Sequence, residues 1–199
     1  MNDRENSNTP VGEVIKSSTS ELVVQCHELY GAPPLGSLLK SGGDNPVFGI
    51  VGQIITQSIY PGRHPRAMAH DESTVEAVYD SNPQLSRLLS TDVYLIVVGY
   101  EQEGQINRYL APLPPKIHDL VYKCEVEELN RFTETLDFLS LLLSYPVGSR
   151  DDVVSAFVRQ ASLSYGNPNE FLVHAGKELA FLLGNEMHRL NGILRRIRP

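Results

Sequence analysis

The chain has 199 residues, a mass of 22.1 kDa and a formal net charge of −7, and 41% of its residues are apolar. This length accommodates one large domain or two small ones with a buried core. No apolar run approaches the roughly 20 residues of a membrane span, and residues 1–10 lack the basic and apolar regions of a signal peptide. We therefore expect a cytoplasmic protein without a membrane contact, and a disordered tail at residues 1–10.

Two cysteines, Cys26 and Cys124, bear on redox chemistry and metal binding. They are too few for a disulfide framework, and no Cys-x-x-Cys pair is present. Structural zinc and thioredoxin-like chemistry are therefore excluded, and we expect both side chains to be buried thiols.

The negative charge is concentrated in the first part of the chain. Residues 1–125 hold 9 Lys and Arg against 15 Asp and Glu, whereas residues 126–199 hold 8 against 9. The last twelve residues contain no acid and four arginines: Arg189, Arg195, Arg196 and Arg198. General binding to nucleic acid requires many phosphates to be neutralised, so the acidic first part argues against it.

Short runs with period-two alternation, bounded by turn residues, predict β-strands between residues 11 and 110. The strongest run is 92–100 (DVYLIVVGY), whose nearly continuous apolar stretch indicates a strand at the centre of a sheet. Gly49 and Gly52 indicate sharp bends, as the corners of a small barrel require. The expected strands are 11–15, 21–26, 35–40, 46–57, 92–100 and 104–110. Together they predict a small closed β-barrel.

A helical crossover is expected inside this barrel. Residues 71–79 have a helical pattern, and Asn82 followed by Pro83 is typical of a helix start. Before the crossover lies a loop rich in Pro and Gly that carries Arg63, His64 and Arg66. These side chains either contact an anion or a partner, or belong to a solvated loop.

Four segments resemble the HAS barrel: 34–40 (PLGSLLK), 47–54 (VFGIVGQI), 82–85 (NPQL) and 93–99 (VYLIVVG). The HAS barrel is the small N-terminal barrel of HerA-type DNA-translocating ATPases and of the catalytic subunits of rotary ATP synthases. A further segment, 113–122 (LPPKIHDLVY), resembles the proline-rich exit from the barrel in HerA-like proteins. The resemblance implies a barrel over residues 11–125 that helps subunits to assemble, and not a part that hydrolyses ATP.

The chain departs from these ATPases because it has no P-loop. That loop requires Gly-x-x-x-x-Gly-Lys-[Ser/Thr], so that backbone amides and the lysine hold the phosphates. The Gly176–Lys177 pair is followed by Glu178 and has Phe171 where the first glycine belongs. We therefore expect no ATPase activity by this mechanism.

From residue 126 onward the apolar period is that of helices. One helix is expected over residues 128–144 and a second after Ser149. A third is expected from Pro168 to Ile197, about 30 residues or ~45 Å long. Such a helix would extend beyond a small domain, and its distal half would either pack within the chain or pair with another subunit. The arginines at its end either stabilise the helix dipole or contact nucleic acid.

No catalytic constellation emerges from the sequence. Cys26 and His27 are neighbours on a strand and point to opposite faces, and the spacing of the six histidines matches no known metal site. We therefore predict an α+β protein with no enzyme activity, cofactor or metal. It has a closed barrel with a short helical crossover at residues 11–125 and about three helices at residues 126–199.

The expected function is that of an interaction or assembly module. It self-associates or docks on a larger ATPase or nucleoprotein complex, so a protein partner or a homo-oligomer is expected. The alternative is a nucleic-acid accessory factor that acts through Arg63, Arg66 and the C-terminal arginines.

Overall fold

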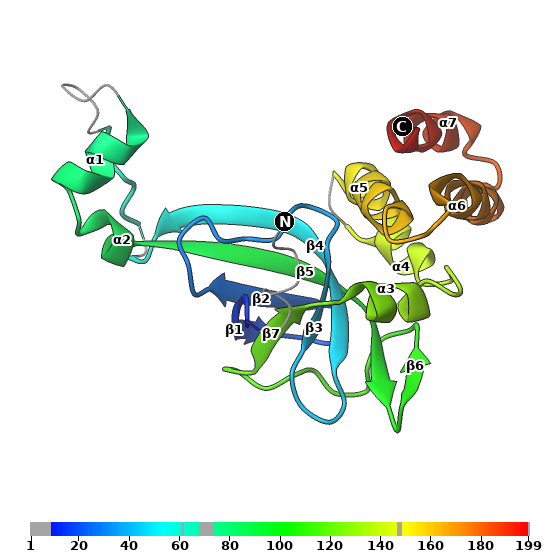
Figure 1. Cartoon of the computed structure of the whole chain (residues 1–199), viewed down its shortest axis with the longest axis horizontal. Helices are drawn as coiled ribbons and strands as arrows, with labels where there is room; N and C mark the ends of the chain where they lie inside the picture. Colours follow the sequence, from blue (N-terminus) through cyan, green and yellow to red (C-terminus); the bar gives the residue numbers. More distant parts are fainter. Residues whose placement is uncertain (1–8, 61, 68–73, 147–148, 199) are drawn as a thin grey trace.

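The computed structural model describes residues 9–60, 62–67, 74–146 and 149–198. Most of the predicted tail, residues 1–8, and the first part of the predicted crossover helix, residues 71–73, lie outside these ranges. The described chain is an α+β protein with a closed antiparallel β-barrel, as predicted (Figure 1).

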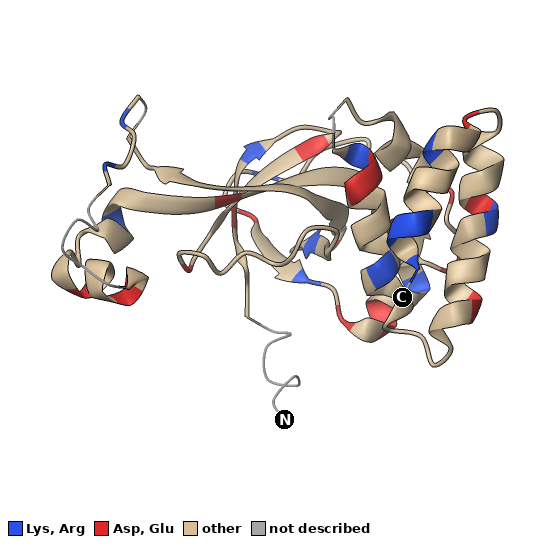
Figure 2. Cartoon of the chain, turned by 90° about the horizontal axis from the view of Figure 1, so that it is seen from above, with Lys and Arg blue, Asp and Glu red and all other residues tan. Residues whose placement is uncertain are grey.

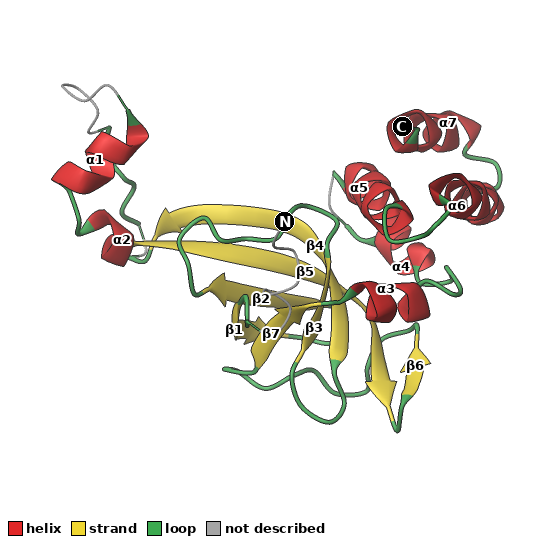
Figure 3. Ribbon diagram, in the orientation of Figure 1, coloured by secondary structure: helices red, strands yellow, loops and turns green. Residues whose placement is uncertain are grey.

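Six antiparallel strands form the barrel, in the order β1-β2-β5-β4-β3-β7, and β7 pairs with β1 to close it. A short seventh strand, β6, extends the sheet beside β5 (Figure 3). The strands are β1 (Gly12–Ser17), β2 (Glu21–Cys26), β3 (Leu38–Ser41), β4 (Val47–Ser58), β5 (Leu89–Gln102), β6 (Gln105–Asn107) and β7 (Leu120–Lys123).

The barrel wall separates two apolar clusters because successive strand residues point to opposite faces. The interior cluster contains Leu22, Val24, Val93, Leu95 and Val97 along with residues of the other strands. The outer cluster joins alternate residues of the same wall to the helices, and its barrel members are Leu38, Phe48, Ile50, Ile96 and Val98. The C-terminal helices therefore share a core with the barrel and do not form a separate body.

Strand β7 was not predicted. The segment 113–122 was interpreted as an exit from the barrel, whereas its last residues pair with both β1 and β3. Val121 is fully buried in the barrel interior. The strand has only four residues and follows a proline-rich run, so its local pattern resembled a connection.

Five helices follow the barrel in the part of the chain that the structure describes, where the sequence predicts about three. They are α3 (Val126–Phe132), α4 (Leu139–Ser144), α5 (Arg150–Ser162), α6 (Pro168–Leu183) and α7 (Met187–Ile197). The single helix expected over 128–144 is wrong, because the chain turns between Phe132 and Phe138. This turn brings both rings into the outer cluster, with ring centres 4.8 Å apart.

The long terminal helix is also wrong. Gly184 adopts a φ of 42°, a left-handed conformation that glycine tolerates, and it ends α6. Helix α7 then folds back and buries Leu190, Ile193 and Ile197 in the outer cluster. These three residues of the distal half therefore pack within the chain, whereas Met187 at the start of α7 stays 57% exposed.

The described part of the crossover between β4 and β5 contains two short helices, α1 (Val75–Ser81) and α2 (Leu85–Leu88). Thr74 caps the start of α1, and its hydroxyl accepts a hydrogen bond from the Ala77 amide at 3.2 Å. Asn82, predicted to begin a helix, instead follows the last turn of α1. Within the described ranges, no helix has the length and hydropathy needed to cross a membrane.

Candidate interaction surface

Two strands continue past the barrel as a projecting hairpin. Strand β3 pairs with β4 only as far as Ile50, whereas β4 and β5 continue to pair from Gln53 with Tyr94 out to Ser58 with Leu89. This hairpin carries α1 and α2 at its far end, away from α5–α7 (Figure 1). We call residues 52–60 and 74–92 the arm.

The arm exposes apolar side chains that a stable domain would bury. No residue of the described helices α1 and α2 is buried. Val75 at the start of α1 is 66% exposed and Tyr60 is 48% exposed. The further large apolar side chains exposed on the arm are Ile54, Ile59 and Leu88. Clustered exposure of this kind marks an interaction surface more often than isolated exposed residues do.

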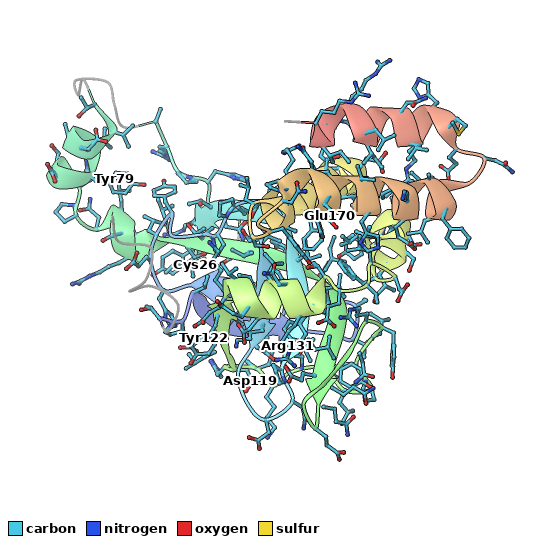
Figure 4. All side chains as sticks on the ribbon, turned by 45° about the vertical axis from the view of Figure 1, so that its right-hand side comes forward. Cys26, Tyr79, Asp119, Tyr122, Arg131 and Glu170 are labelled. Carbon is cyan, nitrogen blue, oxygen red and sulfur yellow. The ribbon has the colours of Figure 1, made fainter. Side chains whose placement is uncertain are left out.

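Few contacts hold the tip of the arm to the barrel. Tyr79 lies on α1 near the end of the arm (Figure 4). Its hydroxyl lies 2.6 Å from that of Tyr30, and the two rings pack edge to face. The hydrogen bond with Tyr30 raises the pKa of Tyr79 to about 12, so the Tyr79 hydroxyl stays protonated at neutral pH. A further bond, from the Ile59 amide to the Leu88 carbonyl at 3.0 Å, lies within the arm and joins its two strands.

The base of the arm, in contrast, is fixed by a buried polar cluster. The Asp92 carboxylate accepts hydrogen bonds from the side-chain amides of Gln25 at 3.4 Å and Gln57 at 3.1 Å. Thr91 contacts the Thr56 hydroxyl and accepts from the Tyr30 amide, each at 2.9 Å. Asp92 is only 5% exposed, so these bonds satisfy a charge that would otherwise be costly to bury. The cluster links β2, β4 and β5 where β4 and β5 leave the barrel.

The two cysteines lie on opposite sides of the barrel wall and are free thiols. Burial, with a smaller contribution from the Asp92 charge, raises the pKa of Cys26 to about 11. Burial also raises the pKa of Cys124 well above its usual range. Both thiols are therefore protonated at neutral pH and are poor nucleophiles.

The predicted basic loop follows β4 at the arm end of the molecule. Arg63, His64 and Arg66 are all exposed there. The Arg63 guanidinium lies 5.4 Å from the centre of the Tyr60 ring, a cation–π geometry.

The C-terminal arginines lie at the other end, on and just after α7, and two of them are paired with acids of α5 (Figure 2). Arg189 has a side chain only 17% exposed and contacts Asp151 at 2.7 Å, and this pairing raises its pKa. Arg196 contacts Asp152 at 3.2 Å. Arg195 and Arg198 are exposed. The basic loop and the C-terminal arginines therefore do not form one continuous surface, and their binding of nucleic acid stays a prediction.

Sequence reasoning missed a cluster of Glu13 with two histidines on the barrel surface. Its two carboxylate oxygens contact His27 at 3.4 Å and His118 at 3.0 Å. The hydrogen bond with His118, followed by that with His27, lowers the pKa of Glu13. The three side chains link β1, β2 and the start of β7, so the cluster bridges the closure of the barrel. Across the described ranges, no group of three or more His, Cys, Asp or Glu is arranged to hold a metal ion.

A groove of about 380 Å³ lies between the barrel and α4. Its main polar side chains are already bonded to each other, because the Tyr145 hydroxyl donates to the Glu21 carboxylate, which also contacts Lys16 at 3.2 Å. Ile96, Val97, Leu110 and Leu141 form the apolar part of its wall. The hydroxyls of Ser18 and Ser144, which also line the groove, donate to backbone carbonyls, so neither is paired with a side-chain base.

No protein-family model matches the chain, and no curated protein matches it. The small closed barrel is therefore a finding of the structure, and its membership of the HAS family stays a resemblance.

Proposed function

We propose that this chain is an assembly module without a catalytic role, and that the arm is the surface through which it binds its partner. The observation that carries the proposal is the combination, on one projecting element, of exposed apolar side chains and a strand edge without a partner. Each feature alone is common on protein surfaces. The two together are typical of a surface that binds another protein chain.

The unpaired edge belongs to the outer half of β4. Its inner half pairs with β3 and then, at Val51, with the backbone of Gly36 and Ser37. From Gly52 to Ser58, the described residues provide backbone partners for β4 only on the β5 side. Free backbone groups in a row form a template to which another strand can add.

A second exposed apolar set supports this choice by contrast. Val173, Phe181 and Met187 are exposed on α6 and at the start of α7. The backbone of a helix is satisfied by its own hydrogen bonds, so these residues offer only side-chain contacts. The arm offers side-chain contacts and a free backbone edge on the same element.

The resemblance to the HAS barrel supports a proposal about the kind of partner that the arm binds. In the ATPases that carry such barrels, the barrel contributes to subunit assembly. We propose that this chain likewise acts within a multi-subunit complex, by self-association or by docking on a larger ATPase or nucleoprotein machine.

We call the barrel together with α3–α7 the body. The test compares Val75→Asp in the arm with Leu113→Asp, a matched change in a loop of the body where the residue is 78% exposed. Asp is well tolerated in the first turn of a helix, so Val75→Asp leaves α1 intact while it adds a charge to the arm. Each full-length chain is tagged at its native locus, and its size is measured in host extract by gel filtration.

The wild type and Leu113→Asp are expected in a complex much larger than one 22.1 kDa chain, and Val75→Asp is expected to shift toward the single chain. A wild-type chain that elutes at monomer mass in extract would contradict the proposed function. A shift for both variants alike would show that the arm is not the contact surface.

A further inference from the structure

We propose that the occupant of the β4 edge is a second copy of this chain, paired antiparallel with the first about a two-fold axis at Ile55. This inference rests on the proposed function, because it names the partner of the same arm. In such a dimer the two arms form one four-stranded sheet in the order β5-β4-β4-β5, and both copies use the same surface.

The backbone pattern identifies which residues face the free edge. The Ile59 amide donates to the Leu88 carbonyl, and this pair continues the register in which Gln53 opposes Tyr94. In an antiparallel ladder, directly opposed residues alternate between bonded and non-bonded pairs. Counting back from Ile59 by twos, residues 57, 55 and 53 bond to β5. The N–H and C=O groups of residues 54, 56 and 58 therefore point away from β5, toward the free edge.

This edge lacks the features that natural proteins use to prevent strand addition. Residues 52–60 (GQIITQSIY) contain no charged residue and no proline. The β-bulge between Val51 and Gln53 lies at the base of the arm, and the register is regular from Gln53 to Ser58. Exposed edges are commonly protected by lysine, proline, a bulge or a short length. An uncharged, regular edge rich in β-branched residues favours pairing.

The sequence of the edge is nearly symmetric about Ile55. Residues 53–57 read Gln-Ile-Ile-Thr-Gln, so Gln53 mirrors Gln57 and Ile54 mirrors Thr56, another β-branched residue. Two copies meeting antiparallel at this centre place glutamine opposite glutamine, Ile55 opposite Ile55, and isoleucine opposite threonine. A chain with a net charge of −7 also meets its own copy here without opposing any charge on the edge strand.

The proposed register agrees with the backbone pattern. With the axis at Ile55, Ile54 of one copy opposes Thr56 of the second copy, and both residues point their N–H and C=O groups outward. Ile55 opposes Ile55 of the second copy as a non-bonded pair, in which side chains approach most closely. Each of the two Ile54–Thr56 pairs then exchanges two backbone hydrogen bonds across the interface.

The register is tested by cross-linking the purified full-length chain. Ile55→Cys places two thiols across the axis, whereas Thr56→Cys, its neighbour, places the two thiols on diagonal positions that are too far apart for an unstrained disulfide. The native Cys26 and Cys124 are buried and contribute little background. Mild oxidation is expected to convert Ile55→Cys, and not Thr56→Cys, into a covalent dimer. Efficient cross-linking of Thr56→Cys with none at Ile55→Cys would overturn the proposed register.

The edge itself is tested by Thr56→Pro. This change removes an outward N–H without removing a backbone hydrogen bond to β5, and the only bond to β5 that it removes among the described residues is the side-chain contact with Thr91. Ile55→Pro, the matched control, removes an inward N–H. Light scattering is expected to give the wild type twice the mass of one chain at high micromolar concentration. Thr56→Pro is expected to raise the dimer dissociation constant by about tenfold or more, with an unchanged far-UV circular dichroism spectrum. Ile54→Lys, which adds like charges near the axis, is expected to act in the same direction if the proline disturbs the arm.

The outcomes separate this inference from the proposed function. A purified wild type that stays monomeric at all concentrations overturns the second copy as occupant. The proposed function still stands in that case if the chain elutes as a larger complex in host extract. A wild-type dimer that neither Thr56→Pro nor Ile54→Lys weakens also overturns the inference, because the contact would then lie elsewhere.

Discussion

The body and the arm use their helices in different ways. Each of the five helices after the barrel buries apolar residues, eight positions being buried in α5 alone, whereas the described arm helices α1 and α2 bury none. Helices α4 and α5 pack on the barrel and α6 and α7 pack on α5, whereas the described arm helices bury none of their own residues. Helices of four and seven residues are marginal without packing. The body is therefore stabilised by its own core, and the exposed arm is the part to which we assign the proposed contact with a partner.

The largest expected effect is on the core of the body. Phe132 is fully buried, with its ring centre 4.9 Å from Phe48 of the barrel and 4.8 Å from Phe138 before α4. Phe132→Ala is expected to lower the free energy of unfolding by about 3–5 kcal/mol. The matched control is Phe181→Ala, whose ring is 81% exposed and whose loss is expected to cost less than about 0.5 kcal/mol.

Urea unfolding followed by circular dichroism and by tyrosine fluorescence measures both variants. The two signals are expected to give one transition, because barrel and helices share the outer cluster. Separate transitions for strands and helices would contradict the shared core.

A smaller effect is expected where the chain approaches α5 closely. Gly36 has a φ of 85°, and a Cβ there would lie 2.4 Å from the Phe157 amide nitrogen. Gly36→Ala is expected to destabilise the body by about 2–4 kcal/mol, since backbone strain and a clash add. Gly43→Ala is the control, because Gly43 has a φ of 87° and open space around its Cβ position. Its expected cost is only about 1 kcal/mol. Equal losses in thermal unfolding would show that the contact with α5 contributes little.

The contact between the barrel and α4 predicts a pH effect. The hydrogen bond from Tyr145 lowers the pKa of Glu21, so the bond stabilises the protein above the ordinary carboxyl pKa of 4.5 and is lost as the pH falls below it. Burial, and then the bond with Glu21, raise the pKa of Tyr145, so stability is also lost as the pH rises above the ordinary tyrosine pKa of 10.

Tyr145→Phe is expected to lower the free energy of unfolding by about 1 kcal/mol at pH 7, because the pair is partly exposed. The difference from the wild type should shrink toward pH 3. A difference that stays constant between pH 7 and pH 3 would show that the Glu21 carboxylate is not the partner that matters.

The smallest effect on stability is expected in the arm. Val75→Asp should change the free energy of unfolding by less than about 0.5 kcal/mol, because the side chain has no buried contact to lose. Calorimetry on the purified chain at low concentration measures this. A loss comparable with that of Phe132→Ala would mean that the arm is part of the stabilised body.

Local pattern predicted the strands better than their partners. The period-two runs identified β1 to β5, because alternate residues face the barrel interior. They could not identify β7, whose four residues gain their role from pairing with strands about 80 to 110 positions earlier. The sequence pattern also did not reveal the helix end at Gly184. Apolar residues keep their helical spacing on both sides of Gly184, because α6 and α7 both pack on α5.

Sequence reasoning missed the candidate surface. The alternation of apolar and polar residues along a strand shows which face is buried, but it does not show which edge has a partner strand. Two signals could have indicated it. The runs that became β4 and β5 are the longest in the chain, with 12 and 14 residues, while the other barrel strands have four to six. The uncharged stretch 52–60 also lies in an otherwise acidic region.

The central claim, that the arm edge is covered in the cell, is tested most directly by thiol labelling in host extract. Thr56→Cys lies on the free edge and Leu113→Cys in an exposed loop of the body, while the native thiols are buried and protonated. Each labelling rate is divided by the rate of the same variant purified and diluted to nanomolar concentration.

The account predicts that maleimide labels Thr56→Cys several-fold more slowly in extract than in the dilute protein, and that Leu113→Cys is labelled equally fast in both. Equal labelling of Thr56→Cys under the two conditions would contradict the account.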